Sequence, residues 1–320
     1  MKKLFLILML ISLVLSSVVA NGSQESTSST GSPAWPTQPI HIIGQASAGA
    51  GPDLFVRELQ PLLQEQLGTS VVVENKAGSG GKIACDYVWK ASPDGYTLLA
   101  HSSPLTTVTQ ISKNCEYSIK DMKHIVAFDI APYAVIVKAD SPIKTISDLI
   151  EAAKSGKISN ANSGIGGAMY LQSRIMAKAL GIDYAEVPYD GTNPCILAVM
   201  NGDVTFSIAD YSTAVNNDQI RIVCLLSDKR ISFVPDAETI VEQGYSIPFM
   251  TMRRGVVAPP NTPDDVCEKL VEAFKNALNN PKFVEYANTN GFQLDILYGY
   301  DYKAKDVEYY ETALQFKDYL

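Results

Sequence analysis

The stretch IHIIGQASAGAGPDLFVRELQPLLQEQLG (residues 40–68) decides the fold that this sequence predicts. It is typical of a buried strand over residues 40–43, a loop of small residues over 45–51, and an amphipathic helix that begins near Pro52. The apolar positions of this helix recur at helical spacing and are expected to pack on a sheet: Leu54, Phe55, Leu59, Leu62, Leu63 and Leu67. Strand and helix signals continue to alternate after it, which predicts an α/β protein with a parallel sheet.

The loop between this strand and helix carries almost no side-chain bulk over residues 48–51, so a ligand is able to approach its backbone closely. Pro52 suits the first helical position, and Asp53 places negative charge in the first turn. Unpaired N–H groups at such a helix start favour an anion. A close-packed turn that binds nothing would have the same sequence, and Asp53 would then stabilise only its own helix.

Composition restricts the class of protein. The chain has 320 residues, of which 46% are hydrophobic and 19% charged, and this length favours two domains over one. The net charge is −8, and no run of Lys and Arg occurs, so nucleic acid is not an expected partner.

The N-terminus reads as an export signal. Lys2 and Lys3 precede an apolar run over residues 4–15, and small residues follow up to Ala20, which predicts a signal peptide over residues 1–20. A retained membrane anchor is the alternative, although the run is short for a membrane span. Residues 21–34 are rich in Ser, Thr and Gly and are expected to form a disordered tether. Because of the signal peptide, the mature chain is expected to be periplasmic or extracytoplasmic.

Metal-binding patterns are missing from the sequence. The five cysteines form no Cys-x-x-Cys pair, and the three histidines show no ligand spacing, so we expect neither a metal site nor a cofactor. The odd number of cysteines excludes complete internal pairing. Buried free thiols are the expected state, although export would permit one or two disulfides.

A second loop of small residues occurs in the middle of the chain. It follows a short predicted strand and precedes a helix, as the first loop does, and its members are Ser163, Gly164, Gly166, Gly167 and Ala168. Ligands of open parallel sheets bind beyond the carboxyl ends of the strands, where such loops gather. If two α/β lobes face one another, both loops point into one cleft and are able to hold an anionic group between them.

Motifs spread over the mature chain resemble those of one family, the substrate-binding proteins of tripartite tricarboxylate transporters, also called the Bug family. They occur in the family's order: WPTQPIHII, the loop over 48–53, VVVENKAGSGGKIA, SPDGYTLL, VPYDG, NGDV and VAPPNTP. The resemblance implies a periplasmic-binding-protein-like type II fold, with two α/β lobes around a cleft and crossover hinge strands. We expect lobe 1 over residues 35–134 and 254–320, and lobe 2 over residues 135–253.

The resemblance also implies the function and the site. It implies a non-enzymatic receptor, expected to be a monomer, that captures a small organic acid or amino acid and delivers it to the membrane subunits of a tripartite tricarboxylate transporter. The ligand-binding residues implied for the first lobe are Ser47, Ala48, Gly49, Ala50, Gly51, Asp53, His101, Ser102 and Ser103. Those implied for the second lobe are Ser163, Gly164, Gly166, Gly167, Ala168, Tyr189 and Asp210. Tyr189 as a packing residue and Asp210 as a helix cap remain alternatives.

Departures from the family pattern bear on the ligand. Two hydroxyl donors and a His usual in the second loop are replaced here by Gly167, Ala168 and Tyr170. An Asp-Asn pair usual at the later strand end is Ala209-Asp210, and a usual Lys is Asp190. Fewer donors and an added acid favour a monocarboxylate, a small dicarboxylate or an amino-bearing acid over a tricarboxylate.

Other functions have weaker support in the sequence. A ligand-binding module that reports to a membrane sensor would have the same features. An exported hydrolase or isomerase would need a nucleophile–base pair, and Ser79-x-x-Lys82 lies in a turn without the further motifs of acyl-transfer enzymes. No P-loop or complete dinucleotide fingerprint occurs. The candidate loops contain no Arg or Lys, and Arg253 and Arg254 near the expected hinge are the alternative source of a cation.

Overall fold

The computed structural model describes residues 35–46, 48–49, 51–156, 158–189, 191–215 and 217–320. The predicted signal peptide and tether lie outside these residues, as do Ser47, Ala50 and Asp190. Within the described ranges, no helix has the length and apolar character needed to span a bilayer. All five cysteines are free thiols, and Cys85, Cys195 and Cys224 are buried, as expected.

The first strand and helix form where the sequence predicts them. Strand β1 spans Ile40–Gly44, and helix α2 spans Gly51–Leu67. Phe55, Leu59 and Leu63, each four residues from the next, are buried on one face of α2 because that spacing brings them to the same side of the helix. Leu54, also expected in the core, is instead 45% exposed because it lies off this stripe.

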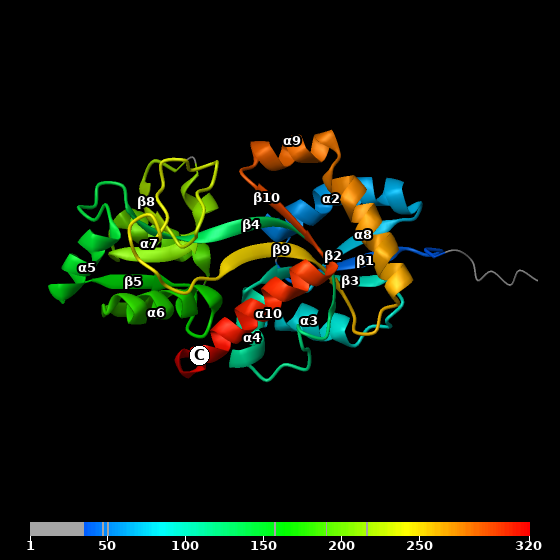
Figure 1. The fold of residues 1–320 in the computed structure, drawn as a ribbon, viewed down its shortest axis with the longest axis horizontal. Helices are drawn as coiled ribbons and strands as arrows, with labels where there is room; N and C mark the ends of the chain where they lie inside the picture. Colours follow the sequence, from blue (N-terminus) through cyan, green and yellow to red (C-terminus); the bar gives the residue numbers. More distant parts are fainter. Residues whose placement is uncertain (1–34, 47, 50, 157, 190, 216) are drawn as a thin grey trace, which may run out of the picture. The chain divides into compact units, whose positions relative to one another are not determined.

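The remaining strands and helices alternate along most of the chain (Figure 1), except that β9 follows β8 and α9 follows α8 directly. The other strands are β2 (Val71–Asn75), β3 (Thr97–Ser103), β4 (Lys123–Lys138), β5 (Ser159–Asn162), β6 (Ala185–Pro188), β7 (Phe206–Asp210), β8 (Ile220–Leu225), β9 (Thr251–Ala258) and β10 (Gln293–Tyr298). The other helices are α3 (Lys82–Trp89), α4 (Leu105–Ser112), α5 (Ile146–Lys154), α6 (Ala168–Leu180), α7 (Thr192–Asn201), α8 (Asp264–Leu278), α9 (Pro281–Thr289) and α10 (Gly299–Gln315). Short 3₁₀ turns are η1 (Ser79–Gly81), η2 (Tyr211–Ala214) and η3 (Lys317–Tyr319).

The strands form two sheets that share β4, and we call each sheet with its helices a lobe. In the first lobe the order is β2-β1-β3-β9-β4, with β10 also paired to β4, and in the second it is β4-β7-β5-β6, with β8 also paired to β4. β1, β2 and β3 are parallel, as are β5, β6 and β7. The sheets are nevertheless mixed and not wholly parallel as predicted, since β9 runs antiparallel to β3 and β4.

Strand β4 connects the two lobes. Its residues 123–132 pair with β9 in the first sheet, and its residues 133–138 pair with β7 and β8 in the second. The sixteen residues of β4 are mostly buried because both sheets are covered by helices. The backbone thus passes between lobes without a loop.

Helix α10 contributes to the cores of both lobes. Tyr302 is part of the first core with Ile43 and Leu99, whereas Tyr309 and Ala313 are part of the second core. Phe316, Tyr319 and Leu320 also pack against that second core. The end of α10, which falls within the range expected for lobe 1, therefore also packs on the second lobe.

Candidate ligand-binding site

A cavity of about 360 Å³ lies between the two lobes. The first lobe lines it with residues of η1 and α4 and the residue that follows α4, namely Gly80, Leu105, Thr109 and Lys113. The second lobe and the connecting strands line it with Tyr133, Ser163, Gly164, Ile165, Gly166, Gly167, Ala168, Met169, Gly191, Thr192, Asp210 and Met252. All six residues predicted from the second loop and from the end of β7 are among them.

The loop between β5 and α6, residues 163–167, is shaped by glycine. Gly164 and Gly166 have φ angles of 123° and 80°, a region that other residues rarely adopt. The Asn162 side chain accepts a hydrogen bond from the Gly164 N–H at 3.1 Å and itself donates to Glu186 at 2.8 Å. Helix α6 begins without a side-chain cap, so its first amides remain available as donors beside the cavity. This arrangement suits a small anionic group.

The opposite wall of the cavity comes from η1 and α4. The Thr109 hydroxyl donates to the Gly80 carbonyl at 2.9 Å, which attaches the turn to the helix. Lys113 donates to the Ser79 hydroxyl at 3.3 Å and is the only cation among the described lining residues. Neither Lys113 nor Thr109 belongs to a sequence motif, so neither is predicted from the sequence. Lys82, considered beside Ser79, pairs instead with Asp86.

Asp210 ends β7 and faces Tyr133 of β4 in the antiparallel pairing. Its Oδ1 atom is buried and has no hydrogen-bond partner among the described residues. Burial raises the pKa of Asp210 to about 7, a change that the Arg254 charge opposes and the Asp129 charge reinforces. The side chain makes no capping bond to η2, so the helix-cap alternative is not supported.

The first-lobe loop predicted to bind ligand does not line this cavity in its described part. Ala48 and Gly49 are exposed, and Gly51 is the first residue of α2. Asp53 is buried and accepts hydrogen bonds from the Gly49 N–H, Arg57 and Asn75 at 2.8–2.9 Å. Burial acts to raise the pKa of Asp53, but these hydrogen-bond donors outweigh it, and the pKa is lowered. Its contact with Arg57 of the same helix fits the alternative role, that of stabilising its own helix.

The residues predicted at the end of β3 lie inside the first lobe and not in the cavity. His101, Ser102 and Ser103 are at most 3% exposed, because β3 pairs with β9 and α10 packs beside it. His101 lies 2.6 Å from the Tyr302 hydroxyl, and Ser103 donates to Asp306. Burial lowers the pKa of His101 to about 4, so its ring is neutral at neutral pH.

Three further candidate binding residues make contacts within the protein and do not line the cavity. Tyr189 is half-buried and packs with the cluster that contains Cys195, which agrees with its packing alternative. Arg254 forms an ion pair with Asp129 in the hinge strands, and Arg253 pairs with Asp295 at 2.5 Å. Burial acts to lower the pKa of the Arg254 guanidinium, but the nearby Asp129 carboxylate has the larger effect and raises this pKa. Neither arginine lines the cavity.

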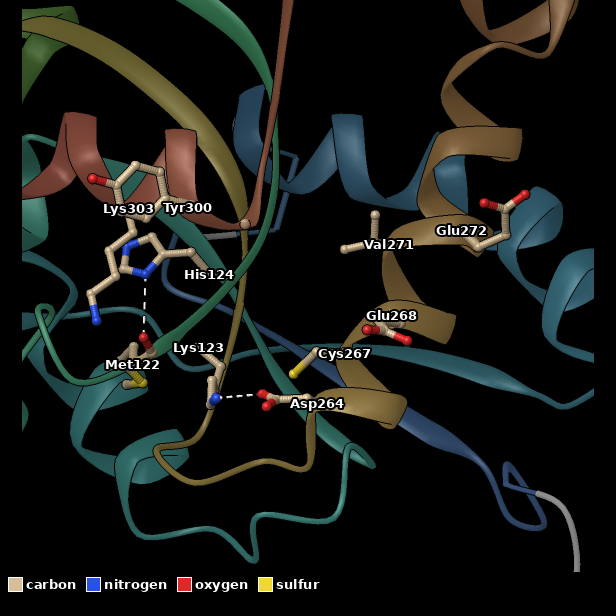
Figure 2. A pocket seen from close by; sticks show the side chains of 11 residues that line it. Met122, Lys123, His124, Asp264, Cys267, Glu268, Val271, Glu272, Tyr300 and Lys303 are labelled. Carbon is tan, nitrogen blue, oxygen red and sulfur yellow. Dashed lines mark hydrogen bonds and ion pairs between the residues drawn. The ribbon is translucent and has the colours of Figure 1, made fainter.

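A larger hollow of about 660 Å³ occurs on the first lobe alone, between α8, the start of β4 and the start of α10 (Figure 2). Asp264, Glu268 and Glu272 project from α8 along one side of it. Lys123 is paired with Asp264 at 2.7 Å. The carboxylates would repel an anion, so the smaller cavity between the lobes is the better ligand site. No cluster of potential metal ligands occurs among the described residues.

Comparison with known sequences agrees with the family that the motifs indicate. A family model described as "Tripartite tricarboxylate transporter family receptor" matches residues 55–304. A UPF0065 protein of Bordetella pertussis is 30% identical over 274 residues, which cover 84% of this chain and 85% of that protein.

Comparison with solved structures addresses the fold. The periplasmic binding protein BugD is 30% identical, with a TM-score of 0.73 over 89% of this chain and 98% of BugD. A TctC solute-binding protein from Polaromonas is 20% identical, with a TM-score of 0.79 over 89% of this chain and all of that chain. These likenesses confirm the predicted periplasmic-binding-protein-like fold.

Proposed function

The chain belongs to the tripartite tricarboxylate transporter receptor family, and from this membership we propose that it captures a small organic carboxylate and delivers it to the membrane subunits of such a transporter. Members of the family are solute-binding receptors and not enzymes. The ligand class, the transporter and the periplasmic location of this chain are our proposals.

The observation that carries the proposal is the chemistry of the cavity between the lobes. The uncapped start of α6 offers amide donors, and Lys113 adds a positive charge on the opposite wall. A cavity of about 360 Å³ is within the usual size range of small-molecule sites. A carboxylate held between Lys113 and the loop over 163–168 would contact both lobes.

Contact with both lobes implies a closing motion. We take residues 35–134 and 254–320 as lobe 1 and residues 135–253 as lobe 2, with the end of α10 resting on lobe 2. A ligand that touches both lobes favours the closed population, and β4 and β9 are the segments that would bend. The leader over residues 1–20 would direct the protein across the membrane before it binds.

Calorimetric titration tests the binding proposal. We expect heat from small mono- or dicarboxylates, and Lys113→Gln should weaken binding about tenfold while Lys113→Arg retains it. The protein should be unfolded and refolded first, so that a co-purified ligand does not occupy the site. Heat only from uncharged solutes would refute the proposal.

Membrane pull-down tests the delivery step. The liganded protein should retain the membrane subunits of a tripartite tricarboxylate transporter from native membranes. Recovery of a sensor kinase or chemoreceptor in their place would assign the chain to sensing.

A further inference from the structure

The polar ends of the cavity differ in charge. Lys113, which directly follows α4, lies on the first-lobe wall, and Asp210 from β7 lies on the second-lobe wall. Asp210 is the only acid among the described lining residues, and its buried Oδ1 atom has no hydrogen-bond partner. An acidic side chain is unexpected in a site that binds carboxylate ligands, because two carboxylates in one small cavity repel each other.

The protein groups around Asp210 do not supply the missing donor. Arg254 from β9 directs its Nε and Nη2 atoms to Asp129 of β4. The Tyr211 hydroxyl of η2 donates to the Gly291 carbonyl at 2.7 Å. Tyr133 of β4 lines the cavity beside Asp210 and keeps its proton, since burial holds its pKa well above the usual value, but its hydroxyl makes no hydrogen bond to Asp210 Oδ1. A buried carboxylate oxygen without a donor is costly, so the ligand is the natural source of one.

We propose that Asp210 determines specificity by selecting ligands that carry an ammonium group in addition to their carboxylate. This inference rests on the proposed function and names its substrate class. The acid group of the ligand lies at the Lys113 and α6 end, and the ammonium group donates to Oδ1 of Asp210. An ammonium–carboxylate bond is charge-assisted and therefore stronger than a bond from a hydroxyl.

The apolar residues of the cavity agree with such a ligand. Leu105, Ile165, Met169 and Met252 line it between the polar groups. They suit the methylene groups that separate the charged groups of such a ligand.

Matched acids provide the test. Calorimetry compares succinate, malate and aspartate, then glutarate with glutamate, and adipate with 2-aminoadipate. In the best-fitting series, the amino acid should bind about tenfold or more tightly than the unsubstituted acid, with the hydroxy acid between them. Asp210→Asn should bring the ratio of these affinities close to one, whereas the exposed-site control Asp203→Asn should leave it unchanged.

The pH dependence gives a second measurement that needs no variant. Because the pKa of Asp210 is about 7, its carboxylate forms as pH rises from 6 to 8, and the preference for the amino acid should rise over this interval. The same ratio should stay flat in Asp210→Asn.

The outcomes separate this inference from the proposed function. Tighter binding of unsubstituted acids, or an unchanged ratio in a folded Asp210→Asn protein, overturns the role of Asp210 and leaves carboxylate capture intact. Failure of every acid in the panel to bind overturns carboxylate capture, and the role of Asp210 with it.

Discussion

Ser112, the last residue of α4, lies against Gly166 of the loop before α6, so that a Cβ placed on Gly166 would be 3.9 Å from the Ser112 Cβ. The two residues belong to different lobes. The lobes are therefore already in contact along one wall of the cavity, and this contact is a place where closure can be obstructed.

A bulky side chain at position 112 should hold the lobes apart. We expect Ser112→Trp to weaken carboxylate binding by about tenfold or more, because the closed state would become less populated. The measurement is calorimetric affinity beside thermal unfolding, and Ser155→Trp at the exposed end of α5 is the control. Unaltered affinity in a folded variant would show that this contact does not limit closure.

Gly80 should resist substitution for two reasons. Its φ of 68° disfavours a side chain, and a Cβ would lie 2.7 Å from the Thr109 hydroxyl oxygen. Gly244 has a similar φ of 85° but open space around it, so Gly244→Ala measures the backbone strain alone. We expect a loss of about 1–2 kcal/mol of unfolding free energy in Gly244→Ala.

Gly80→Ala should lose more stability than Gly244→Ala, and it alone should weaken ligand binding, because Gly80 lines the cavity. Chemical denaturation and calorimetry measure both effects. Equal stabilities of the two variants would mean that Thr109 moves aside without cost.

Gly255 in β9 lies where a side chain has no room. A Cβ there would overlap the Val126 carbonyl of β4 and lie 2.7 Å from the Tyr302 hydroxyl. Gly255→Ala should therefore cost about 3 kcal/mol or more of unfolding free energy, as overpacking beside a rigid backbone does at its upper end. Adding Tyr302→Phe should not restore stability, because the Val126 carbonyl remains, and restoration would identify the hydroxyl as the obstacle.

The charge of Asp210 should make stability depend on pH. Its pKa rises from 3.8 to about 7 on folding, so the folded state binds more protons than the unfolded state between these values. Stability contributed by this group therefore falls as pH rises from 4 to 7. At about 1.4 kcal/mol per pKa unit the loss is at most a few kcal/mol.

The measurement for Asp210 is the difference in unfolding free energy between Asp210→Asn and the parent protein at several pH values. Because the other titrating groups are common to both proteins, the variant should gain stability relative to the parent as pH rises from 4 to 7. A difference that does not change with pH would show that Asp210 is ionised throughout.

The second-lobe part of the site was predictable because its signal is local. Gly164 and Gly166 are needed for backbone angles that few other residues adopt, and the loop follows a strand in the sequence. Asp210 was predictable for a similar reason, since it ends a strand on the same edge of the sheet. For these residues, the residue type and its position after a predicted strand are enough to predict that it lines the cavity.

The first-lobe residues predicted to bind ligand are held away from the cavity by contacts between distant segments. Asp53 is held by Asn75 of another strand, and His101 is covered by Tyr302, which is 201 residues away in the chain. The sequence offers no spacing that reveals these partners. Lys113 was missed because a single lysine at a helix end resembles any surface lysine until the topology brings it to the cavity.

The packing of the residues that follow α10 has a practical consequence for handling the protein. Since Phe316, Tyr319 and Leu320 pack against the core of the second lobe, a purification tag or dye attached after Leu320 would start beside that core. Such an attachment would disturb the region whose displacement an optical experiment is meant to follow, so fluorophores for distance measurements belong on exposed positions of α5 and α9 instead.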